Sequence, residues 1–356
     1  MMHNIIHDDI QKILSSPLPF EKLYGKTVII SGANGYVPAY FVYTFLALND
    51  LRGAGIKVFA LCRDEKRARE RFADFTGRQD FQLVIQDICK PVDLDEEIHV
   101  YIHAASPAGI LKRHEDPVNT FLANVKGAEN MLNLAMHHPC QYFLFLSSVD
   151  VYGKRENSER LKEDMSGYLD PLNIRNVYSC GKRAAETLCK AYQMKYHVPV
   201  FLVRPFQIIG PGPDLNDGRL HIDFISQMLK GNRIVLKSDG TAIRTFMYIA
   251  DAIIAMLTVM LKGSPGEAYN IVDENGEASV KELAEIMASL IADRMVEVTF
   301  DYERRNTIEV TGALSKVTGN SEKLAALGWV PFYSLTEGAL RMMEYYGLNV
   351  IKRRRE

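Results

Sequence analysis

A short apolar run that ends in a glycine-rich turn lies near the start of this chain. Residues 26–31 (Lys-Thr-Val-Ile-Ile-Ser) have the pattern of a buried strand, and Gly32 and Gly35 mark the turn that follows them. A helix pattern begins directly afterwards, near Tyr36. A strand, a glycine-rich turn and a helix in this order are typical of a doubly wound α/β fold, where the helix start can hold a phosphate. A purely structural turn is the alternative, because the glycine spacing alone is not specific.

Strand and helix patterns then alternate as far as residue 204. The strand patterns lie at 57–62, 81–85, 100–103, 142–147 and 200–203, and long helix patterns lie at 118–137 and 178–196. This alternation predicts a Rossmann-type α/β fold, in which a doubly wound parallel sheet carries helices on both faces.

The character of the sequence changes at residue 205. Glycine and proline gather at 210–213, and a further strand pattern lies at 268–272. We therefore predict three parts in the chain. They are an N-terminal extension (1–25) with a helix near 10–15, a dinucleotide-binding domain (26–204) that a segment of about 243–262 rejoins, and a smaller substrate-binding domain (205–242 and 263–356).

Composition argues against several classes of protein. The chain has 42 basic and 44 acidic residues, so no excess charge would attract nucleic acid. No apolar run approaches the length of a membrane span, and residues 1–24 lack the apolar stretch of a signal peptide. The five cysteines are scattered without a Cys-x-x-Cys pair, which favours reduced thiols, a cytoplasmic location and no metal site.

The glycine-rich turn is the predicted pyrophosphate site of a nicotinamide cofactor. Backbone N–H groups and the positive end of a helix can hold such a group. The third position of the glycine pattern is Pro38, which a helix tolerates in its first turn because no helical hydrogen bond is lost there. The residues expected at the pyrophosphate are Gly32, Asn34, Gly35, Tyr36 and Val37.

Residues after the second and third strand patterns bear on the adenosine half of the cofactor. Arg63 slightly favours NADP as the cofactor, since arginine accommodates a 2′-phosphate. Asp64 keeps NAD as the alternative, since an acidic residue can bind a free 2′-hydroxyl. A solvated, charged helix start is the alternative. Asp87 and Ile88 are candidates to flank the adenine, although an aspartate that caps a turn is equally ordinary.

Several short motifs follow one another in the later half of the predicted domain. Ser147 and Ser148 end a strand pattern, Tyr152 and Gly153 come next, and a Tyr-x-x-x-Lys pair begins a helix pattern. Together with the runs at 103–106, 124–127, 204–206 and 244–248, these motifs resemble the extended short-chain dehydrogenases of the NAD-dependent epimerase/dehydratase family. The resemblance covers nearly all residues after about 26. Within the family, 181–183 and 216–219 look most like UDP-glucuronate decarboxylases.

Tyr178 and Lys182 are the predicted catalytic pair. They are four residues apart and so share one face of a helix, where the ammonium can lower the pKa of the tyrosine. Taken alone, such a spacing would more often be a surface pair. The resemblance implies that Tyr178 takes the proton of a sugar C4 hydroxyl while hydride passes to the nicotinamide, and that Ser148 binds the same hydroxyl. The product of this step is a transient 4-ketone.

The next chemical step depends on residues 148–150. Dehydratases of the family carry an aspartate where this chain has Val149, so dehydration is disfavoured. Decarboxylases carry a glutamate where Asp150 stands, which favours a decarboxylase-like reaction and counts slightly against simple 4-epimerisation. A turn-capping aspartate is the alternative for Asp150. A 4-epimerase, then a 4,6-dehydratase or ketosugar reductase, and last a non-catalytic NADP-binding protein are the alternative functions.

The resemblance implies further contacts. A nucleotide sugar, preferably a UDP-sugar, would meet Arg219 and Arg244, whose guanidinium groups suit phosphate. Gln207 stands where the family usually has asparagine. A homodimer through a helix bundle that contains the Tyr-Lys helix is also implied. The remaining residues expected at the cofactor are Ala104, Ala105, Ser106 and Asn124, with Tyr178 and Lys182.

Overall fold

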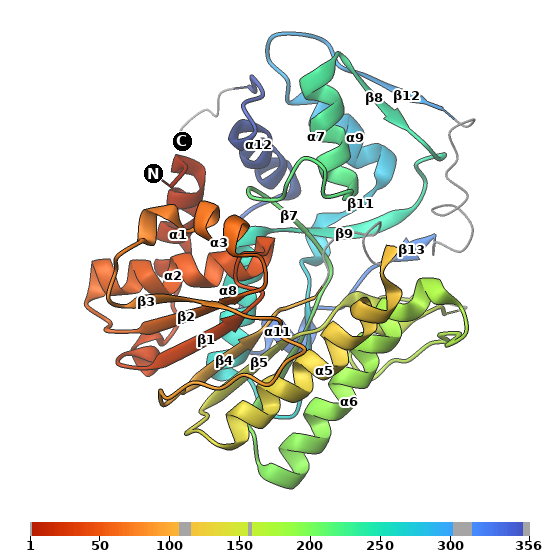
Figure 1. Cartoon of the computed structure of the whole chain (residues 1–356). Coiled ribbons are helices and arrows are strands. Elements are labelled where there is room, and N and C mark those ends of the chain that lie inside the picture. The colour runs from red at the N-terminus through yellow and green to blue at the C-terminus, as the bar shows by residue number, and fades with distance from the viewer. Residues whose placement is uncertain (1, 107–114, 156–158, 302–314, 352–356) are drawn as a thin grey trace.

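The computed structural model describes residues 2–106, 115–155, 159–301 and 315–351 (Figure 1). Its centre is a seven-stranded sheet in which each neighbouring pair of strands is parallel, in the order β10-β6-β5-β4-β1-β2-β3. The order reverses between β1 and β4, which is where such sheets bind ligands. The strands are β1 (Thr27–Ser31), β2 (Lys57–Cys62), β3 (Phe81–Ile85), β4 (Val100–His103), β5 (Tyr142–Leu146), β6 (Val200–Pro205) and β10 (Ala268–Ile271).

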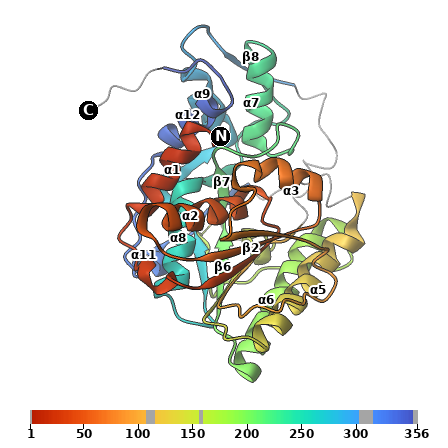
Figure 2. The same ribbon diagram turned by 60° about the vertical axis from the view of Figure 1, so that its left-hand side comes forward.

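Helices cover both faces of this sheet, which confirms the predicted fold class (Figure 2). Along β1, Val28 and Ile30 pack into the core beneath one helical layer, while Ile29 packs into the core beneath the other. The strand therefore has a continuous apolar run rather than an alternating one. The first layer contains α1 (Asn4–Leu14), α2 (Tyr36–Arg52) and α8 (Ile249–Lys262), and the second contains α5 (Pro117–Met136) and α6 (Val177–Tyr196).

A smaller layer lies beyond the carboxyl ends of the parallel strands (Figure 1). It has a four-stranded sheet, in which β9 pairs with β7, β11 and β13, and a two-stranded sheet of β8 and β12. These strands are β7 (Gln207–Ile209), β8 (Arg233–Leu236), β9 (Ile243–Tyr248), β11 (Glu277–Ser279), β12 (Glu297–Phe300) and β13 (Lys316–Val317). Its helices are α7 (Leu220–Lys230), α9 (Val280–Ser289) and α12 (Leu335–Tyr345).

Short helices complete the described elements. They are α3 (Glu65–Arg71), α11 (Glu322–Ala325) and the 3₁₀ helices η1 (Phe20–Leu23), η2 (Ala73–Phe75), η3 (Val149–Tyr152), η4 (Ile174–Asn176) and η5 (Glu274–Gly276). None of the helices in the described ranges is long and apolar enough to cross a membrane.

Three placements differ from the sequence prediction. The strand expected in the smaller domain at 268–272 is β10 of the large sheet, because it pairs with β6 and buries Tyr269 and Ile271 in the main core. Within the segment 243–262, α8 packs on the large sheet, whereas β9 belongs to the smaller one. The N-terminal helix covers Asn4–Leu14 rather than 10–15.

Candidate functional site

The glycine-rich turn brings the ends of β1 and β4 into close contact. Gly32 has a φ of +66°, and a Cβ added to it would lie 2.8 Å from the Cα of Ala105. Only glycine combines this backbone conformation with so close an approach. On the other side of the contact, the Ser31 hydroxyl accepts hydrogen bonds from the N–H groups of Ala104 and Ala105, each at 3.2 Å.

Helix α2 begins normally in spite of its proline. Gly35 is the N-cap, the N–H of Ala39 donates to the Gly35 carbonyl at 3.2 Å, and Pro38 is buried in the first turn. Residue 38 would have no acceptor inside the helix, so proline removes no hydrogen bond. The start of α2 is therefore a regular helix N-terminus, and Asn34 and Val37 lie there at half-buried positions.

The two aspartates near the expected adenosine site serve as caps. The Asp64 carboxylate accepts the N–H of Arg67 at 3.0 Å and caps α3, and the Asp87 carboxylate accepts the N–H of Cys89 at 2.9 Å. Arg63 is exposed directly after β2. Ile88 is buried in the core beneath α5 and α6. Capping therefore accounts for Asp64 and Asp87 without a ligand, while Arg63 keeps the position expected of a ribose contact.

The Tyr-Lys pair lies at the start of α6, next to the end of β5. Both side chains are buried, with Tyr178 9% and Lys182 2% exposed. The Lys182 ammonium donates to the Leu146 carbonyl at 2.6 Å and lies 5.9 Å from the centre of the Tyr178 ring. A desolvated cation this close to a phenol favours the phenolate. The predicted partners are therefore brought together.

Ser148 and Asp150 follow β5 on the same side. The Ser148 hydroxyl accepts the N–H of Asp150 at 3.1 Å and caps η3, which packs against α6. Asp150 is exposed. Burial lowers the pKa of Arg244, and the charge of the Asp150 carboxylate opposes that shift. Arg244 lies on β9 and donates to the carbonyl of Ile243 at 2.7 Å, and Gln207 lies on the neighbouring strand β7.

Behind Lys182 stands a histidine that the sequence prediction did not include in the site. His103 is fully buried at the end of β4, and its Nδ1 lies 2.7 Å from the Ser31 hydroxyl. Burial and the charge of Lys182 lower the pKa of His103 to about 3, so the ring is neutral near pH 7. The run at 103–106 contained the signal, because a strand-end histidine adjoins the predicted cofactor residues.

Asn124 is buried on α5, opposite Gly181 of α6. An added Cβ at Gly181 would lie 3.3 Å from the Asn124 Cβ, so the glycine permits this close packing. The Asn124 amide donates to the Thr120 carbonyl at 2.7 Å. Its Oδ1, like the Ser106 hydroxyl, is buried without a hydrogen-bond partner among the described residues. Two predicted cofactor residues thus keep polar atoms that a bound molecule can satisfy.

The loop before α7 contacts the start of α2. The Arg219 guanidinium lies 5.2 Å from the centre of the Tyr36 ring, and its Nε forms an ion pair with Asp217 at 3.1 Å. The Nη1 of Arg219 and the hydroxyl of Tyr36 are both buried, and neither has a hydrogen-bond partner within the described part of the chain. Cationic and hydroxyl donors left open between the two layers fit a phosphate-containing ligand.

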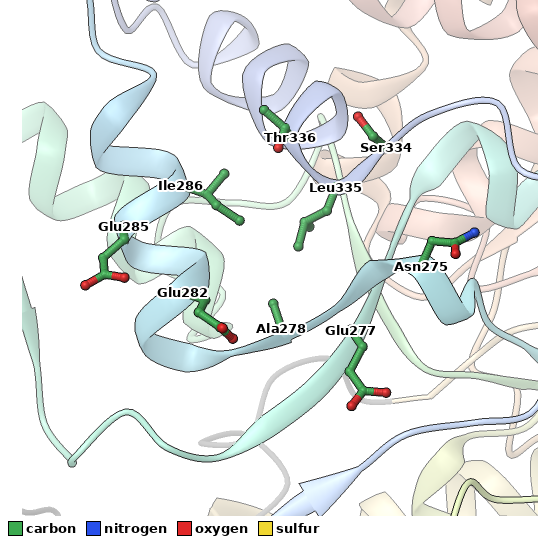
Figure 3. A pocket seen from close by; sticks show the side chains of 9 residues that line it. All are labelled: Asn275, Glu277, Ala278, Glu282, Glu285, Ile286, Ser334, Leu335 and Thr336. Carbon is green, nitrogen blue, oxygen red and sulfur yellow. The ribbon is translucent and has the colours of Figure 1, made fainter.

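A hollow of about 420 Å³ lies elsewhere, between α9 and α12 (Figure 3). Three glutamates line it, which makes it unsuitable for a phosphate, and none of the predicted site residues lies in it. Its lining residues are Asn275, Glu277, Ala278, Glu282, Glu285, Ile286, Ser334, Leu335 and Thr336. Among the residues that the structure describes, no group of three or more His, Cys, Asp or Glu side chains is placed to hold a metal ion.

Known proteins resemble this chain along most of its length. UDP-glucuronic acid decarboxylase 5 of Arabidopsis thaliana is 29% identical over 327 residues, which cover 91% of this chain and 90% of the relative. UDP-glucuronic acid decarboxylase 1 of Danio rerio is 28% identical over 326 residues, which cover 90% and 72%. These relatives confirm the resemblance that the motifs predicted.

Solved structures confirm the fold. An epimerase from Methanothermobacter thermautotrophicus has a TM-score of 0.76 at 20% identity, covering 96% of this chain and 95% of that one. A dTDP-glucose 4,6-dehydratase from Bacillus anthracis in complex with NAD has a TM-score of 0.73 at 20% identity, covering 90% and 96%.

The cofactor named in that dehydratase complex is NAD, and none of these likenesses supports the tilt towards NADP. The sequence profile of the NAD dependent epimerase/dehydratase family matches residues 28–272, from β1 to the end of the large sheet. This match spans the glycine-rich turn, Ser148 and the Tyr178–Lys182 pair. The chain belongs to the NAD dependent epimerase/dehydratase family.

Proposed function

We propose that this protein oxidises the C4 hydroxyl of a nucleotide sugar transiently and decarboxylates UDP-glucuronate. The contact that carries the proposal is the buried Lys182 ammonium, held by the Leu146 carbonyl beside Tyr178. The identity of the substrate rests on the relatives, two of which are UDP-glucuronic acid decarboxylases that match about nine-tenths of this chain. We propose NAD as the cofactor, and Arg63 keeps NADP as the second candidate.

The proton steps belong to three side chains. When bound, the nicotinamide supplies the hydride acceptor and later the hydride donor. The Tyr178 phenolate accepts the proton of the C4 hydroxyl, Lys182 stabilises that phenolate, and Ser148 orients the hydroxyl by a hydrogen bond. Removal of the hydride from C4 and of the proton from the oxygen of its hydroxyl leaves a ketone at C4. A carboxylate on C5 is then β to the ketone and is lost as carbon dioxide, and a proton is delivered to C5 before the hydride returns.

Asp150 and Arg244 support the decarboxylation step in this proposal. Arg244 is a half-buried cation of β9, so it suits a substrate with a uronate or a diphosphate. Asp150 lies on η3, and its charge acts on Arg244; in this proposal its carboxylate exchanges a proton at C5, directly or through water. Arg219 and Tyr36, with their open buried donors, are the proposed contacts of the diphosphate.

A 4-epimerase is the second candidate. Asp150 is one methylene shorter than the glutamate that the resemblance to decarboxylases implies, and it is exposed, so it differs from the expected acid in length. Dehydration is less favoured, because Val149 is a buried apolar residue that can donate no proton to a leaving hydroxyl.

The test is a substrate panel. The purified protein is incubated with NAD⁺ or NADP⁺ and with UDP-, dTDP-, GDP- and CDP-sugars that include uronates, and the products are separated and weighed by mass spectrometry. We expect UDP-glucuronate alone to lose the mass of carbon dioxide, and Tyr178→Phe to give no product. Conversion of UDP-glucuronate into an isomer of equal mass would favour the epimerase, and a panel without any product would overturn both candidates.

A further inference from the structure

The N-terminal helix α1 brings one buried carboxylate to three other elements. Asp9 is fully buried. Its carboxylate accepts the Tyr40 hydroxyl of α2 at 3.1 Å, the Tyr248 hydroxyl at the end of β9 at 2.8 and 2.9 Å, and the Arg341 guanidinium of α12 at 2.6 and 3.0 Å. One residue outside the family-matched range thus joins both layers of the molecule.

Two of these partners lie on elements that also carry residues of the candidate site. Tyr40 follows Tyr36 by four residues on α2, the helix that begins at the glycine-rich turn. Tyr248 follows Arg244 by four residues on β9. Asp9 therefore links, from behind the site, the helix of the cofactor and the strand that faces the sugar.

The third partner connects the same carboxylate to the loop before α7, which carries Arg219. Arg341 lies on α12, and near the end of that helix the Tyr346 hydroxyl donates to the Pro213 carbonyl at 2.5 Å. Pro213 belongs to the loop that leads to Arg219. A shift of α12 would therefore move this loop relative to α2.

The cluster is rigid because its polar groups satisfy one another. Arg341 is 6% exposed and also donates to the Ile5 carbonyl at 3.0 Å and the Tyr248 hydroxyl at 3.1 Å. Inside a protein, charges that lose such partners are strongly penalised, so the arrangement is held in one geometry. The apolar face of α1 adds Ile6, Ile10, Ile13 and Leu14 to the main core.

We propose that Asp9 is a positioning residue, through which α1 holds α2 and β9 at the separation that hydride transfer between cofactor and sugar requires. The proposal rests on the proposed function, because it assigns the cofactor to α2 and the sugar to the side of β9. Hydride transfer depends steeply on the distance between donor and acceptor, whereas each ligand can still bind to its own side. Loss of the link should therefore lower kcat more than it raises KM.

The test uses variants that delete one hydroxyl and keep the Asp9–Arg341 ion pair. Tyr40→Phe cuts the link to α2, and Tyr248→Phe cuts the link to β9. Tyr101→Phe is the matched control, since it removes an equally buried hydroxyl from β4 at a distance from the cluster. Two variants at different ends of the link keep the test valid if one of them folds poorly.

The first measurement is hydrogen exchange, which requires no turnover. In the wild type, NAD⁺ should slow amide exchange in α2 and also in β9 and α12. In Tyr40→Phe and Tyr248→Phe, NAD⁺ should still slow exchange in α2. Exchange in β9 and α12 should then be as fast as it is without the cofactor. Tyr101→Phe should behave as the wild type. Protection by NAD⁺ that never reaches β9 and α12, or that persists in both link variants, overturns the proposal.

The second measurement is steady-state kinetics with UDP-glucuronate. Each link variant should lose about tenfold or more in kcat with KM changed by no more than about twofold, as expected when alignment rather than binding is lost. Equal kcat in the link variants and in Tyr101→Phe would also overturn the positioning role. A wild type that binds NAD⁺ with the expected exchange pattern but does not convert UDP-glucuronate would contradict the proposed function alone.

Discussion

The Lys182 ammonium donates to the Leu146 carbonyl at 2.6 Å, two residues before Ser148. A lysine that is 2% exposed needs such an acceptor, because an ammonium without one is costly to bury. The carbonyl also fixes the direction of the ammonium and leaves Tyr178 within its field. The end of β5 and the start of α6 are therefore joined through this hydrogen bond.

Tyr178→Phe should abolish the proposed base without disturbing the fold. The ring is retained, so the free energy of unfolding and the affinity for NAD⁺ should change little. Turnover of the substrate should fall by about a hundredfold or more, as expected when a general base is removed. Steady-state rates, cofactor titration and thermal unfolding measure the three quantities, and near-normal turnover in the variant would refute the assignment.

Arg63→Ala tests the choice of cofactor. If Arg63 contacts the adenosine ribose, the variant should lose affinity for NADP⁺ by a larger factor than for NAD⁺, because only NADP⁺ presents a 2′-phosphate to the guanidinium. Binding of both cofactors is measured by calorimetry, with the neighbouring Lys66→Ala as a control for the general loss of positive charge. Equal losses for the two cofactors would exclude Arg63 from this role.

The strands of the parallel sheet were largely predictable, since most of them are short apolar runs followed by a helix pattern. The partner of β10 was not. Its run at 268–271 has a recognisable strand composition, but that composition does not show that Ala268 pairs with Leu202 rather than with the smaller sheet. Pairing depends on the path of the chain, and the path depends on the long connection through α7, β9 and α8.

The catalytic pair was predictable because its chemistry depends on local spacing, four residues on one helix. The Asp9–Arg341 ion pair was not, because its members are 332 residues apart and leave no local pattern. The role of Asp64 could not be predicted for another reason. Asp64 after a strand can cap a helix or bind a ribose, and only the 3.0 Å contact with the N–H of Arg67 identifies the cap.

Two buried histidines should make the protein sensitive to acid. Burial lowers the pKa of His103 and of His221 to about 3, with contributions from the charges of Lys182 and Arg219, against an ordinary value of 6.5. As the pH falls from 6.5 towards 3, the unfolded chain binds protons at these rings and the folded chain does not. The free energy of unfolding should therefore fall by about 1.4 kcal/mol per pH unit for each histidine.

Denaturant unfolding at several pH values between 7.5 and 5 measures this slope. His221→Leu should reduce the slope by the contribution of one histidine. His7→Gln changes an exposed side chain and should leave the slope as in the wild type. If the slope does not change in His221→Leu, groups other than this histidine must cause the acid sensitivity.

A homodimer is expected through α5 and α6. Val118, Phe121 and Leu122 of α5 are 66%, 37% and 43% exposed, which is a large apolar surface for one turn of a helix. Sedimentation should therefore give twice the 40.2 kDa of the chain. Leu122→Arg should shift the protein to the monomer, whereas Leu229→Arg, at a similarly exposed leucine of α7, should not. A wild type that sediments as a monomer would contradict this assembly.

Asp150→Asn separates the oxidation step from the step that follows it. The amide keeps the shape of the carboxylate but cannot exchange a proton, so Tyr178 should still oxidise C4 while protonation at C5 is blocked. Reduced cofactor should then accumulate in the presence of UDP-glucuronate and be visible by its absorbance, with little final product. Arg244 would lose the opposing carboxylate charge, so UDP-glucuronate binding is measured as a control.

A 4-epimerase needs only a rotation of the ketone between loss and return of the hydride, and for such an enzyme Asp150→Asn should change little. Full turnover by Asp150→Asn without accumulation of reduced cofactor would therefore exclude the decarboxylase mechanism and favour epimerisation.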